Sequence, residues 1–276
     1  MRCAVFIACL AWACVALLVA VAVRRCQCVG EPFTPAQNRP LIPLQIWRTS
    51  HLDPSLIPDL FGDRAARFKV HAPWTDEMCV QFLRDEFGPT VADAFRNLRK
   101  GAHKADLWRY AILYKRGGVY LDIKSGLYEP LLPLIESLNA HPKFSWLAVL
   151  SHDRSHIFNG IIATPPGNPI LLEAVHHAAS TVETTNARYD ALVEHLKRLC
   201  ERVYGAGVGS APVTLESDST RLQLLLEKCG NRECGVEGRA GGVAKDRYGT
   251  CCSAYASVHE RPIFQVRDPR YPWRER

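Results

Sequence analysis

Three side chains near the middle of the chain have types and spacing suited to binding a charged substrate. Asp106 and Arg109 are three residues apart, and Asp122 follows further along. On a helix, residues three apart share a face, so this carboxylate and guanidinium would lie side by side. An isolated pair of this kind is usually a surface ion pair worth about 0.3–0.5 kcal/mol. Whether it has a functional role therefore depends on the elements that carry it.

The segment GAHKADLWRYAILYKRGGVYLD, residues 101–122, predicts a helix followed by a strand. Its apolar residues recur with the i, i+3, i+4, i+7 spacing of an amphipathic helix. Gly117-Gly118 supplies the left-handed turn that ends many helices. The strand 119–121 then places Asp122 at its carboxyl end, which is the edge where open α/β sheets bind ligands.

The flanking sequence predicts an α/β fold. Short apolar runs indicate strands, and longer segments with caps or periodicity indicate helices. Strands are expected at 41–47, 68–71, 144–150 and 157–163, and helices at 75–87, 169–184, 189–200 and 212–228. Strands that alternate with helices predict a mainly parallel sheet with helices on both faces.

The stretch KADLWRYAILYKRGGVYLDIK, residues 104–124, resembles the core motif of a glycosyltransferase family. That family contains initiating α-1,6-mannosyltransferases, inositol-phosphoceramide mannosyltransferases, bacterial capsule and lipopolysaccharide transferases, and giant-virus relatives. Two further blocks, IPLQIWRTS (42–50) and FNGIIATPPGNPILLEAV (158–175), are similar to the family's opening strand and its later Asn-containing strand. The resemblance covers about residues 41–180 well and the C-terminal hundred weakly.

The resemblance implies a glycosyltransferase A-type, Rossmann-like fold that binds a nucleotide-diphosphate sugar and a divalent metal, Mn or Mg. It implies transfer of a hexose, with mannose as the first candidate, to a glycan or glycolipid with retention of configuration. By position, Asp106 would bind hydroxyls of the donor, Arg109 would contact the donor sugar or diphosphate, and Asp122 would be the first metal-binding Asp. Further donor-binding candidates are Gln45, Trp47, Tyr120 and Asn159. A buried Trp is more often plain core, and a structural hydrogen bond fits Asn159 equally well.

Lys124 departs from the family pattern, because it stands where the second Asp of the Asp-x-Asp motif usually lies. A protonated Lys cannot ligate a metal, but its ammonium group can neutralise phosphate. In one interpretation Asp122 holds the metal with waters and other groups, and in another Lys124 partly replaces the metal, so both are catalytic candidates. A third interpretation is an inactive site in a membrane-anchored nucleotide-sugar-binding or scaffold protein.

The amino terminus predicts a membrane anchor over residues 1–25. Residues 3–23 carry no charge and, as a helix, would span roughly 30 Å, the thickness of a hydrocarbon core. A cleaved signal peptide is the alternative, although the run exceeds the usual ~7–15-residue signal core. We expect a stalk at 26–40 and a catalytic domain at 41–276, with a loop insertion at 229–255. The domain is expected in the Golgi or ER lumen, although the flanking arginines do not decide orientation.

The amino-acid composition limits the kinds of partner and metal expected for this chain. Of its 276 residues, 47% are hydrophobic, enough for one large core. The net charge of +6 is modest and the Lys and Arg are dispersed, so no dedicated nucleic-acid surface is expected. The eleven Cys permit disulfides in an oxidising lumen or buried free thiols. Those near the C-terminus lack Cys-x-x-Cys spacing, which argues against zinc.

Overall fold

The computed structural model describes residues 39–50, 59–229, 252–255 and 262–265. Residues 40–276 group into one compact unit, separate from Met1–Arg39. The expected anchor and nearly all of the stalk lie outside the described residues. Within the described ranges, no helix is long and apolar enough to cross a membrane.

A ten-stranded mixed sheet forms the centre of the domain, in the order β2-β1-β3-β6-β5-β8-β9-β10-β4, with β7 paired to β8. The strands are β1 (Gln45–Trp47), β2 (Lys69–Val70), β3 (Gly118–Leu121), β4 (Gly126–Leu127), β5 (Phe144–Leu150), β6 (Ile157–Thr164), β7 (Val213–Glu216), β8 (Thr220–Cys229), β9 (Cys252–Tyr255) and β10 (Pro262–Gln265). Strands β2, β1, β3, β5 and β8 run in one direction, and β6 runs against them. The expected mainly parallel direction is therefore confirmed from β2 to β8, whereas the reversed β6 was not expected.

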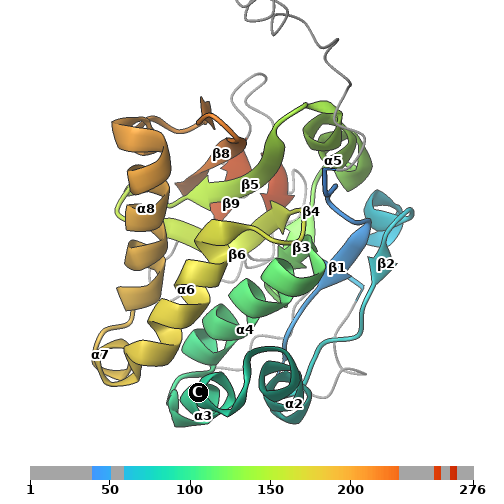
Figure 1. Cartoon of the computed structure of the whole chain (residues 1–276). Helices are drawn as coiled ribbons and strands as arrows, with labels where there is room; N and C mark the ends of the chain where they lie inside the picture. Colours follow the sequence, from blue (N-terminus) through green and yellow to red (C-terminus); the bar gives the residue numbers. More distant parts are fainter. Residues whose placement is uncertain (1–38, 51–58, 230–251, 256–261, 266–276) are drawn as a thin grey trace, which may run out of the picture. The chain divides into compact units, whose positions relative to one another are not determined.

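Helices cover both faces of this sheet, as expected, but unequally. They are α2 (Asp76–Phe87), α3 (Pro89–Asn97), α4 (Gly101–Arg116), α5 (Leu131–Ala140), α6 (Pro169–Ser180), α7 (Val182–Ala187) and α8 (Ala191–Tyr204), with 3-10 turns η2 (Gly62–Ala65) and η3 (Gly205–Ser210). Figure 1 shows α4, α6 and α8 side by side over one face. The other face packs against α5 and η2.

Strand β5 shows how the sheet separates two hydrophobic cores. Trp146 and Ala148 belong to the core beneath α4, α6 and α8, whereas Leu147 and Val149 belong to the core beneath α5. Successive side chains of a strand point to opposite faces, so both faces of β5 are buried. This explains why the continuous apolar run at 144–150 forms a strand.

Two glycines turn the chain from α4 directly into β3. Gly117 ends the helix with φ 61°, and Gly118 follows with φ 101°. A Cβ on Gly117 would lie 2.7 Å from Pro166, and one on Gly118 would lie 2.8 Å from the carbonyl oxygen of Gln45. The short reversal brings the end of β3 back beside the first turns of α4, which places Asp122 next to the helix.

Residues 212–228 form the β7–β8 hairpin, so the helix predicted there is wrong. Leu222 and Leu224 face one core and Leu225 faces the other, because β8 lies inside the sheet between β5 and β9. A strand buried on both faces gives a continuous apolar run that periodicity cannot separate from a buried helix. The polar turn Ser217-Asp218-Ser219 was the signal against a helix.

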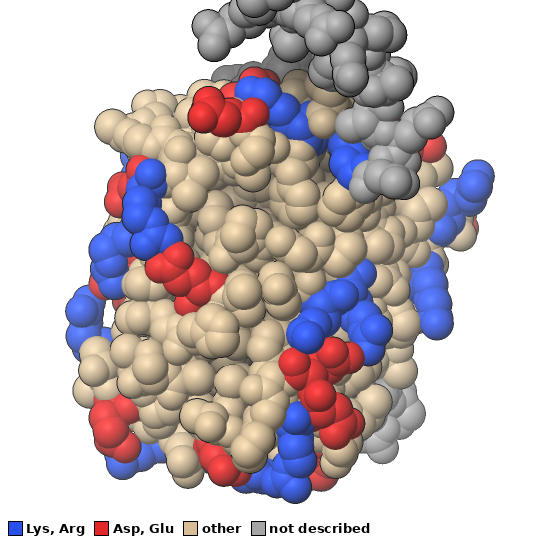
Figure 2. All heavy atoms as spheres, in the orientation of Figure 1, with Lys and Arg blue, Asp and Glu red and all other residues tan. Residues whose placement is uncertain are grey.

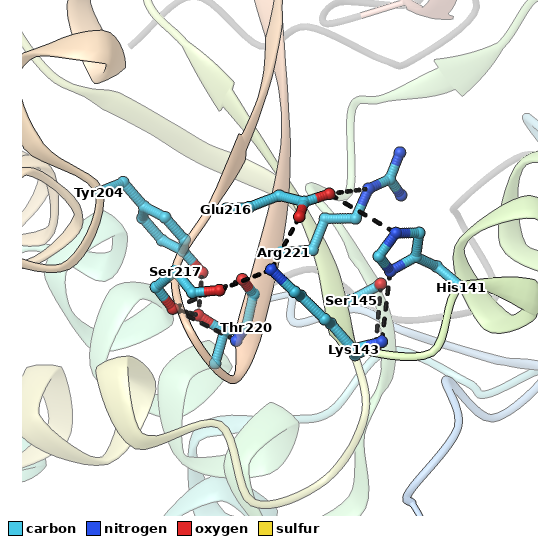
Figure 3. Close-up of polar contacts among 8 residues, drawn as sticks. All are labelled: His141, Lys143, Ser145, Tyr204, Glu216, Ser217, Thr220 and Arg221. Carbon is cyan, nitrogen blue, oxygen red and sulfur yellow. Dashed lines mark hydrogen bonds and ion pairs between the residues drawn. The ribbon is translucent and has the colours of Figure 1, made fainter. Parts of the chain in front are cut away.

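Polar contacts fasten this hairpin to the start of β5, as Figure 3 shows. The Nζ of Lys143 donates to Oε2 of Glu216 and to the carbonyl oxygen of Ser217, both at 2.8 Å. The hydroxyl of Thr220 lies 2.8 Å from that of Tyr204, at the end of α8. These contacts lie at the amino ends of β5 and β8, the sheet edge opposite to Asp122.

The described strands β9 and β10 continue the sheet beyond β8. Within the range 229–255 predicted as a loop insertion, Cys229 ends β8 and Cys252–Tyr255 form β9, while 230–251 lie outside the described residues. Strand β10 pairs antiparallel with both β9 and β4. The strand that follows Asp122 is therefore joined to the C-terminal part of the chain.

Charged side chains on the helical face form mixed pairs. Figure 2 shows basic and acidic groups next to one another on the face that Figure 1 presents. Lys115 and Arg116, at the end of α4, contact Glu86 of α2 at 3.3 and 2.5 Å. Arg202 of α8 pairs with Glu173 of α6. Exposed pairs contribute about 0–1 kcal/mol each, so apolar packing provides most of the stability of this layer.

Candidate functional site

The centre of the candidate site is a guanidinium between two carboxylates. Nη2 of Arg109 lies 3.2 Å from Oδ1 of Asp106 and 3.2 Å from Oδ1 of Asp122. Helix α4 supplies the first two residues, and Asp122 follows β3. The structure thus brings together the three residues that the sequence singled out, at the carboxyl end of β3; their binding of a donor stays a prediction.

Arg109 is held in one orientation by its remaining contacts. Its Nε donates to the carbonyl oxygen of Ala105 at 3.1 Å, and its Nη1 donates to Oδ1 of Asn159 at 2.9 Å. The guanidinium carbon lies 4.4 Å from the ring centroid of Tyr120. The side chain is only 4% exposed. A planar guanidinium with this many fixed contacts orients its neighbours more than it adapts to a ligand.

Asn159, near the start of β6, completes the buried part of this cluster. Its Nδ2 donates to Oδ1 of Asp106 at 3.0 Å and to the hydroxyl of Tyr110 at 2.6 Å. The amide orientation is consistent, because the oxygen faces Arg109 and the NH₂ group faces a carboxylate. Both N–H groups and the oxygen have protein partners, which supports the structural interpretation of Asn159.

Asp122 is the most exposed member of the central trio, with 19% of its side chain accessible against 9% for Asp106 and 4% for Arg109. Its Oδ1 also accepts a hydrogen bond from the hydroxyl of Tyr120 at 3.2 Å. Its backbone N–H donates to the carbonyl oxygen of Gly160 at 2.8 Å. Asp122 is therefore held through Oδ1 and its backbone, and among the described residues no hydrogen bond to its Oδ2 is present.

The trio carries a formal charge of −1, because two carboxylates share one guanidinium. Burial raises the pKa of Asp106, against the opposing effects of Arg109 and of the hydrogen bond from Asn159. Burial also opposes the charged form of Arg109, but Tyr120, Asp122 and Asp106 outweigh it and raise the pKa of Arg109. Arg109 therefore stays charged, and the negative excess suits a cation or the hydroxyl groups of a sugar.

A divalent metal fits this site if it is shared with the substrate. Within the part of the chain that the structure describes, no three His, Cys, Asp or Glu side chains are grouped to hold a metal. Asp122 offers one hard oxygen ligand, and Mg²⁺ commonly combines one or two carboxylates with waters and substrate phosphates. Lys124 lies two residues on, partly buried in the turn before β4. The residues present fit an ion held by Asp122 on the protein side.

Gln45 and Trp47 lie at the other end of α4, outside this cluster. The indole N–H of Trp47 donates to the carbonyl oxygen of Gly117 at 2.8 Å, and Nε2 of Gln45 donates to that of Arg116 at 3.0 Å. The Trp47 ring also stacks on His71 with centroids 3.8 Å apart. Both side chains brace the glycine turn, and their donor-binding role stays a prediction.

Sequence reasoning missed two residues of the site. Tyr110 was assigned only to the apolar stripe of α4, yet its hydroxyl accepts the hydrogen bond from Asn159. A fully buried Tyr needs a polar partner, which was the available signal. Gly160 was the second: a Cβ there would lie 2.8 Å from Oδ2 of Asp122 and 2.5 Å from the ring of Phe158. That crowding depends on strand pairing, which the sequence does not show.

The class of protein follows from a family comparison. Residues 63–145 match the model described as the glycosyltransferase sugar-binding region containing the DXD motif. This range contains Asp106, Arg109, Asp122 and Lys124. The resemblance predicted from the sequence is confirmed, and the chain carries a sugar-binding region of the glycosyltransferase type.

Individual relatives are fungal mannosyltransferases. Mannosyl phosphorylinositol ceramide synthase SUR1 of Saccharomyces cerevisiae is 33% identical over 102 residues, which are 37% of this chain and 24% of that protein. Inositol phosphoceramide mannosyltransferase 3 of Schizosaccharomyces pombe is 29% identical over 143 residues, 50% of this chain and 36% of the relative. The initiation-specific alpha-1,6-mannosyltransferase of Candida albicans is 34% identical over 92 residues, 33% of this chain and 22% of the relative. The matches thus span between 22% and 36% of these relatives.

Among solved structures, the PaToxG glycosyltransferase aligns with 62% of this chain and 72% of its own, with a TM-score of 0.41 and 13% identity.

Proposed function

We propose that this protein is a retaining hexosyltransferase that moves a sugar from a nucleotide diphosphate to a glycan or glycolipid. The observation that carries the proposal is the position of Asp122, held by Arg109, Tyr120 and Gly160 at the carboxyl edge of the sheet with 19% of its side chain exposed. Ligands of open α/β sheets bind at this edge. The match to the glycosyltransferase sugar-binding region covers Arg109, Tyr120 and Asp122.

The residues divide into those that touch the donor and those that position them. Asp122 binds the donor, directly or through an ion shared with the diphosphate, and Asp106 accepts hydrogen bonds from donor hydroxyls. Arg109 is nearly fully buried, so it acts as a positioning residue that holds both carboxylates. A bound divalent metal would supply positive charge to the diphosphate leaving group, whose negative charge grows as the glycosidic bond breaks. Lys124, two residues from Asp122, supplies a second cation for the same charge.

Mannose is the first candidate sugar, because the relatives are named as mannosyltransferases. Their acceptors differ, since some names give inositol phosphoceramide and another gives initiation-specific mannosyl transfer. The acceptor here is therefore proposed only as a glycan or glycolipid. Retention is proposed from the family resemblance, and NMR of the product anomer would overturn it if the configuration were inverted.

The test is donor turnover by the full chain in detergent micelles. The protein is incubated with a panel of nucleotide-diphosphate mannose, glucose, galactose and N-acetylglucosamine donors, and release of nucleotide diphosphate is measured. Release from one donor, reduced about a hundredfold or more by Asp122→Ala, supports the proposal. No release from any donor with membrane acceptor lipids present, or equal release by the variant, overturns it.

A catalytically silent nucleotide-sugar-binding or scaffold protein is the second candidate, motivated by Lys124 in place of the usual acidic residue. One titration with a nucleotide sugar, in which binding and nucleotide release are both measured, distinguishes the two functions. Calorimetric binding of a nucleotide sugar without any nucleotide release favours the silent protein, whereas turnover excludes it.

We also propose that residues 3–23 anchor the protein in an ER or Golgi membrane with the catalytic domain in the lumen. The support is the uncharged run flanked by arginines. Extraction at alkaline pH and protease protection of sealed vesicles test this. A protein released by carbonate, or digested without detergent, contradicts the anchor or the orientation respectively.

A further inference from the structure

Tyr189 stands out among the described residues because a large aromatic ring is left on the surface. It is 60% exposed, the highest value among the exposed large hydrophobic side chains of the described chain. It lies in the three-residue link, 188–190, between α7 and α8. Single exposed apolar side chains are common on protein surfaces, so any role of this ring depends on what surrounds it.

The turn that carries Tyr189 is fastened to the start of α4. Nε2 of His103 donates to the carbonyl oxygen of Tyr189 at 3.0 Å, and His103 is 1% exposed. Nearby, the side chain of Asn186 accepts from the N–H of Arg99 at 2.8 Å and donates to the carbonyl oxygen of Asn97 at 3.0 Å. These hydrogen bonds join residues 186–189 to residues 97–103, so the backbone of Tyr189 is held in place.

This fixed position is next to the candidate donor site. His103 precedes Asp106 by three residues on α4, a rise of about 4.5 Å. The rings of His103 and Tyr189 have centroids 5.6 Å apart. Burial and then the carboxylates of Asp106 and Asp122 raise the pKa of the Tyr189 phenol, while Arg109 opposes them. The ring therefore lies beside the turn of α4 that precedes Asp106.

The chemistry around the ring suits a sugar. Nζ of Lys100 lies 5.1 Å from the centroid of Tyr189, over the ring face. The C–H groups on one face of a pyranose carry small positive charges that a negative aromatic face attracts. An ammonium beside the ring adds hydrogen-bond donors for the hydroxyls. Because the ammonium lies over one face of the ring, a neutral hexose would stack on the opposite face.

We infer that Tyr189 is the platform on which the acceptor sugar stacks as it approaches the donor held at Asp106 and Asp122, with Lys100 donating to its hydroxyls. The inference rests on the proposed function and deepens it. His103 is a positioning residue, because it holds the backbone of Tyr189 by a hydrogen bond and packs against its ring.

The acceptor is favoured over the nucleotide by the side of α4 on which the platform lies. Figure 1 shows α7, beside the turn, on the side of α4 opposite to β1. A donor that extends from β1 toward Asp122 leaves the flank of Tyr189 for the second substrate.

The test uses the full chain with methyl α-D-mannopyranoside as the acceptor probe and the donor that the parent turns over. Tyr189→Ala is expected to raise the KM for the probe about tenfold and to lower the ratio of transfer to donor hydrolysis by a similar factor, because stacking worth about 1.4 kcal/mol is lost. Tyr189→Trp retains a ring and is expected to stay within about threefold of the parent. Val203→Ala, an exposed apolar truncation on α8, is the matched control.

Saturation-transfer NMR of the probe with parent and Tyr189→Ala measures binding without turnover. If the parent binds the probe and the variant does not, the platform is supported even when no donor is turned over, which by itself would overturn only the proposed function. Equal binding and equal KM values for parent and Tyr189→Ala overturn the platform while leaving the transferase proposal standing. A similar loss in Tyr189→Trp, or in Val203→Ala, also overturns it, because a ring would then not be the relevant feature.

Discussion

Arg109 of α4 and Asp122 after β3 lie 3.2 Å apart, although one is on a helix and the other follows a strand. Their pairing depends on the immediate reversal at Gly117-Gly118 and on the pairing of β3 with β6, whose Gly160 receives the N–H of Asp122. The same guanidinium holds Asp106. One buried cation therefore sets the position of both carboxylates that the proposed reaction uses.

Two substitutions of Arg109 test separately the planar shape of its guanidinium and its positive charge. Arg109→Lys keeps a cation but loses the planar fork, so turnover should fall about a hundredfold, as expected when a donor ligand shifts by about 1 Å. Arg109→Ala leaves the buried carboxylate of Asp106 and the partly buried one of Asp122 without their shared cation, and should lower the free energy of unfolding by about 3 kcal/mol. Steady-state kinetics and urea unfolding measure the two effects.

Arg96→Lys is the matched control, because Arg96 forms the exposed i, i+3 pair with Asp93 at 2.6 Å. It should change neither activity nor stability measurably. If Arg109→Lys turned over the donor as fast as the parent, the planar guanidinium would not be what positions Asp122.

Gly160 provides a test that removes no charged group. A Cβ at this position would meet Oδ2 of Asp122 at 2.8 Å and the Phe158 ring at 2.5 Å. Gly160→Ala should therefore displace the carboxylate, lower turnover at least about tenfold and cost about 1–3 kcal/mol of stability. Gly209→Ala is the control, because a Cβ there meets nothing within 4 Å. Equal turnover in both variants would contradict the dependence of turnover on the position of the Asp122 carboxylate.

The local signals of the sequence predicted the helix–turn–strand unit well. The helix at 101–116, its end at the double glycine and the following strand all occur as expected, because caps and periodicity act within a few residues. The close approach of Asp122 to Asp106 and Arg109 depends on this unit together with the pairing of β3 with β6. Its function as a donor site is still a prediction.

Features that depend on strand pairing could not be predicted. The Leu-rich stretch at 222–226 forms β8 because it pairs with β5, and a run buried on both faces carries no strand periodicity. The hydrogen bond from Asn159 to Tyr110 and the crowding at Gly160 arise from β6 lying antiparallel beside β3. Tyr189 was assigned to a predicted helix, and only the contact of its turn with α4 places it near the site.

A stacked histidine pair between α6 and α8 predicts sensitivity to acid. The rings of His177 and His195 lie 3.4 Å apart at 8°, and burial, with help from His177 and Arg198, lowers the pKa of His195 to about 4. The folded state keeps His195 neutral, whereas the unfolded chain binds a proton below about pH 6.5. Stability should therefore fall as pH drops from about 6.5 to about 4 and change no further from this group below that.

The measurement is the urea midpoint between pH 4 and 8 for the parent, His195→Gln and His176→Gln. His195→Gln should have a flatter profile between pH 6.5 and 4, while the exposed His176 on α6 serves as the control. Parallel profiles for all three proteins would rule out His195 as the source of acid sensitivity.

The last prediction concerns Lys124, which replaces the second acidic residue of the motif. An ammonium group interacts with phosphate without a metal, while one hard oxygen ligand is lost, so dependence on manganese should be weaker than in a two-carboxylate site. Lys124→Asp restores that ligand and should increase stimulation by manganese, and Asp122→Ala should reduce turnover about a hundredfold or more. Activity is measured with chelator and across a manganese titration for the parent and both variants. A parent that chelator abolishes, with Lys124→Asp no more responsive to manganese, would disprove the replacement of metal by Lys124. An Asp122→Ala protein as active as the parent would disprove the assigned donor site itself, so the two ideas fail separately in one assay.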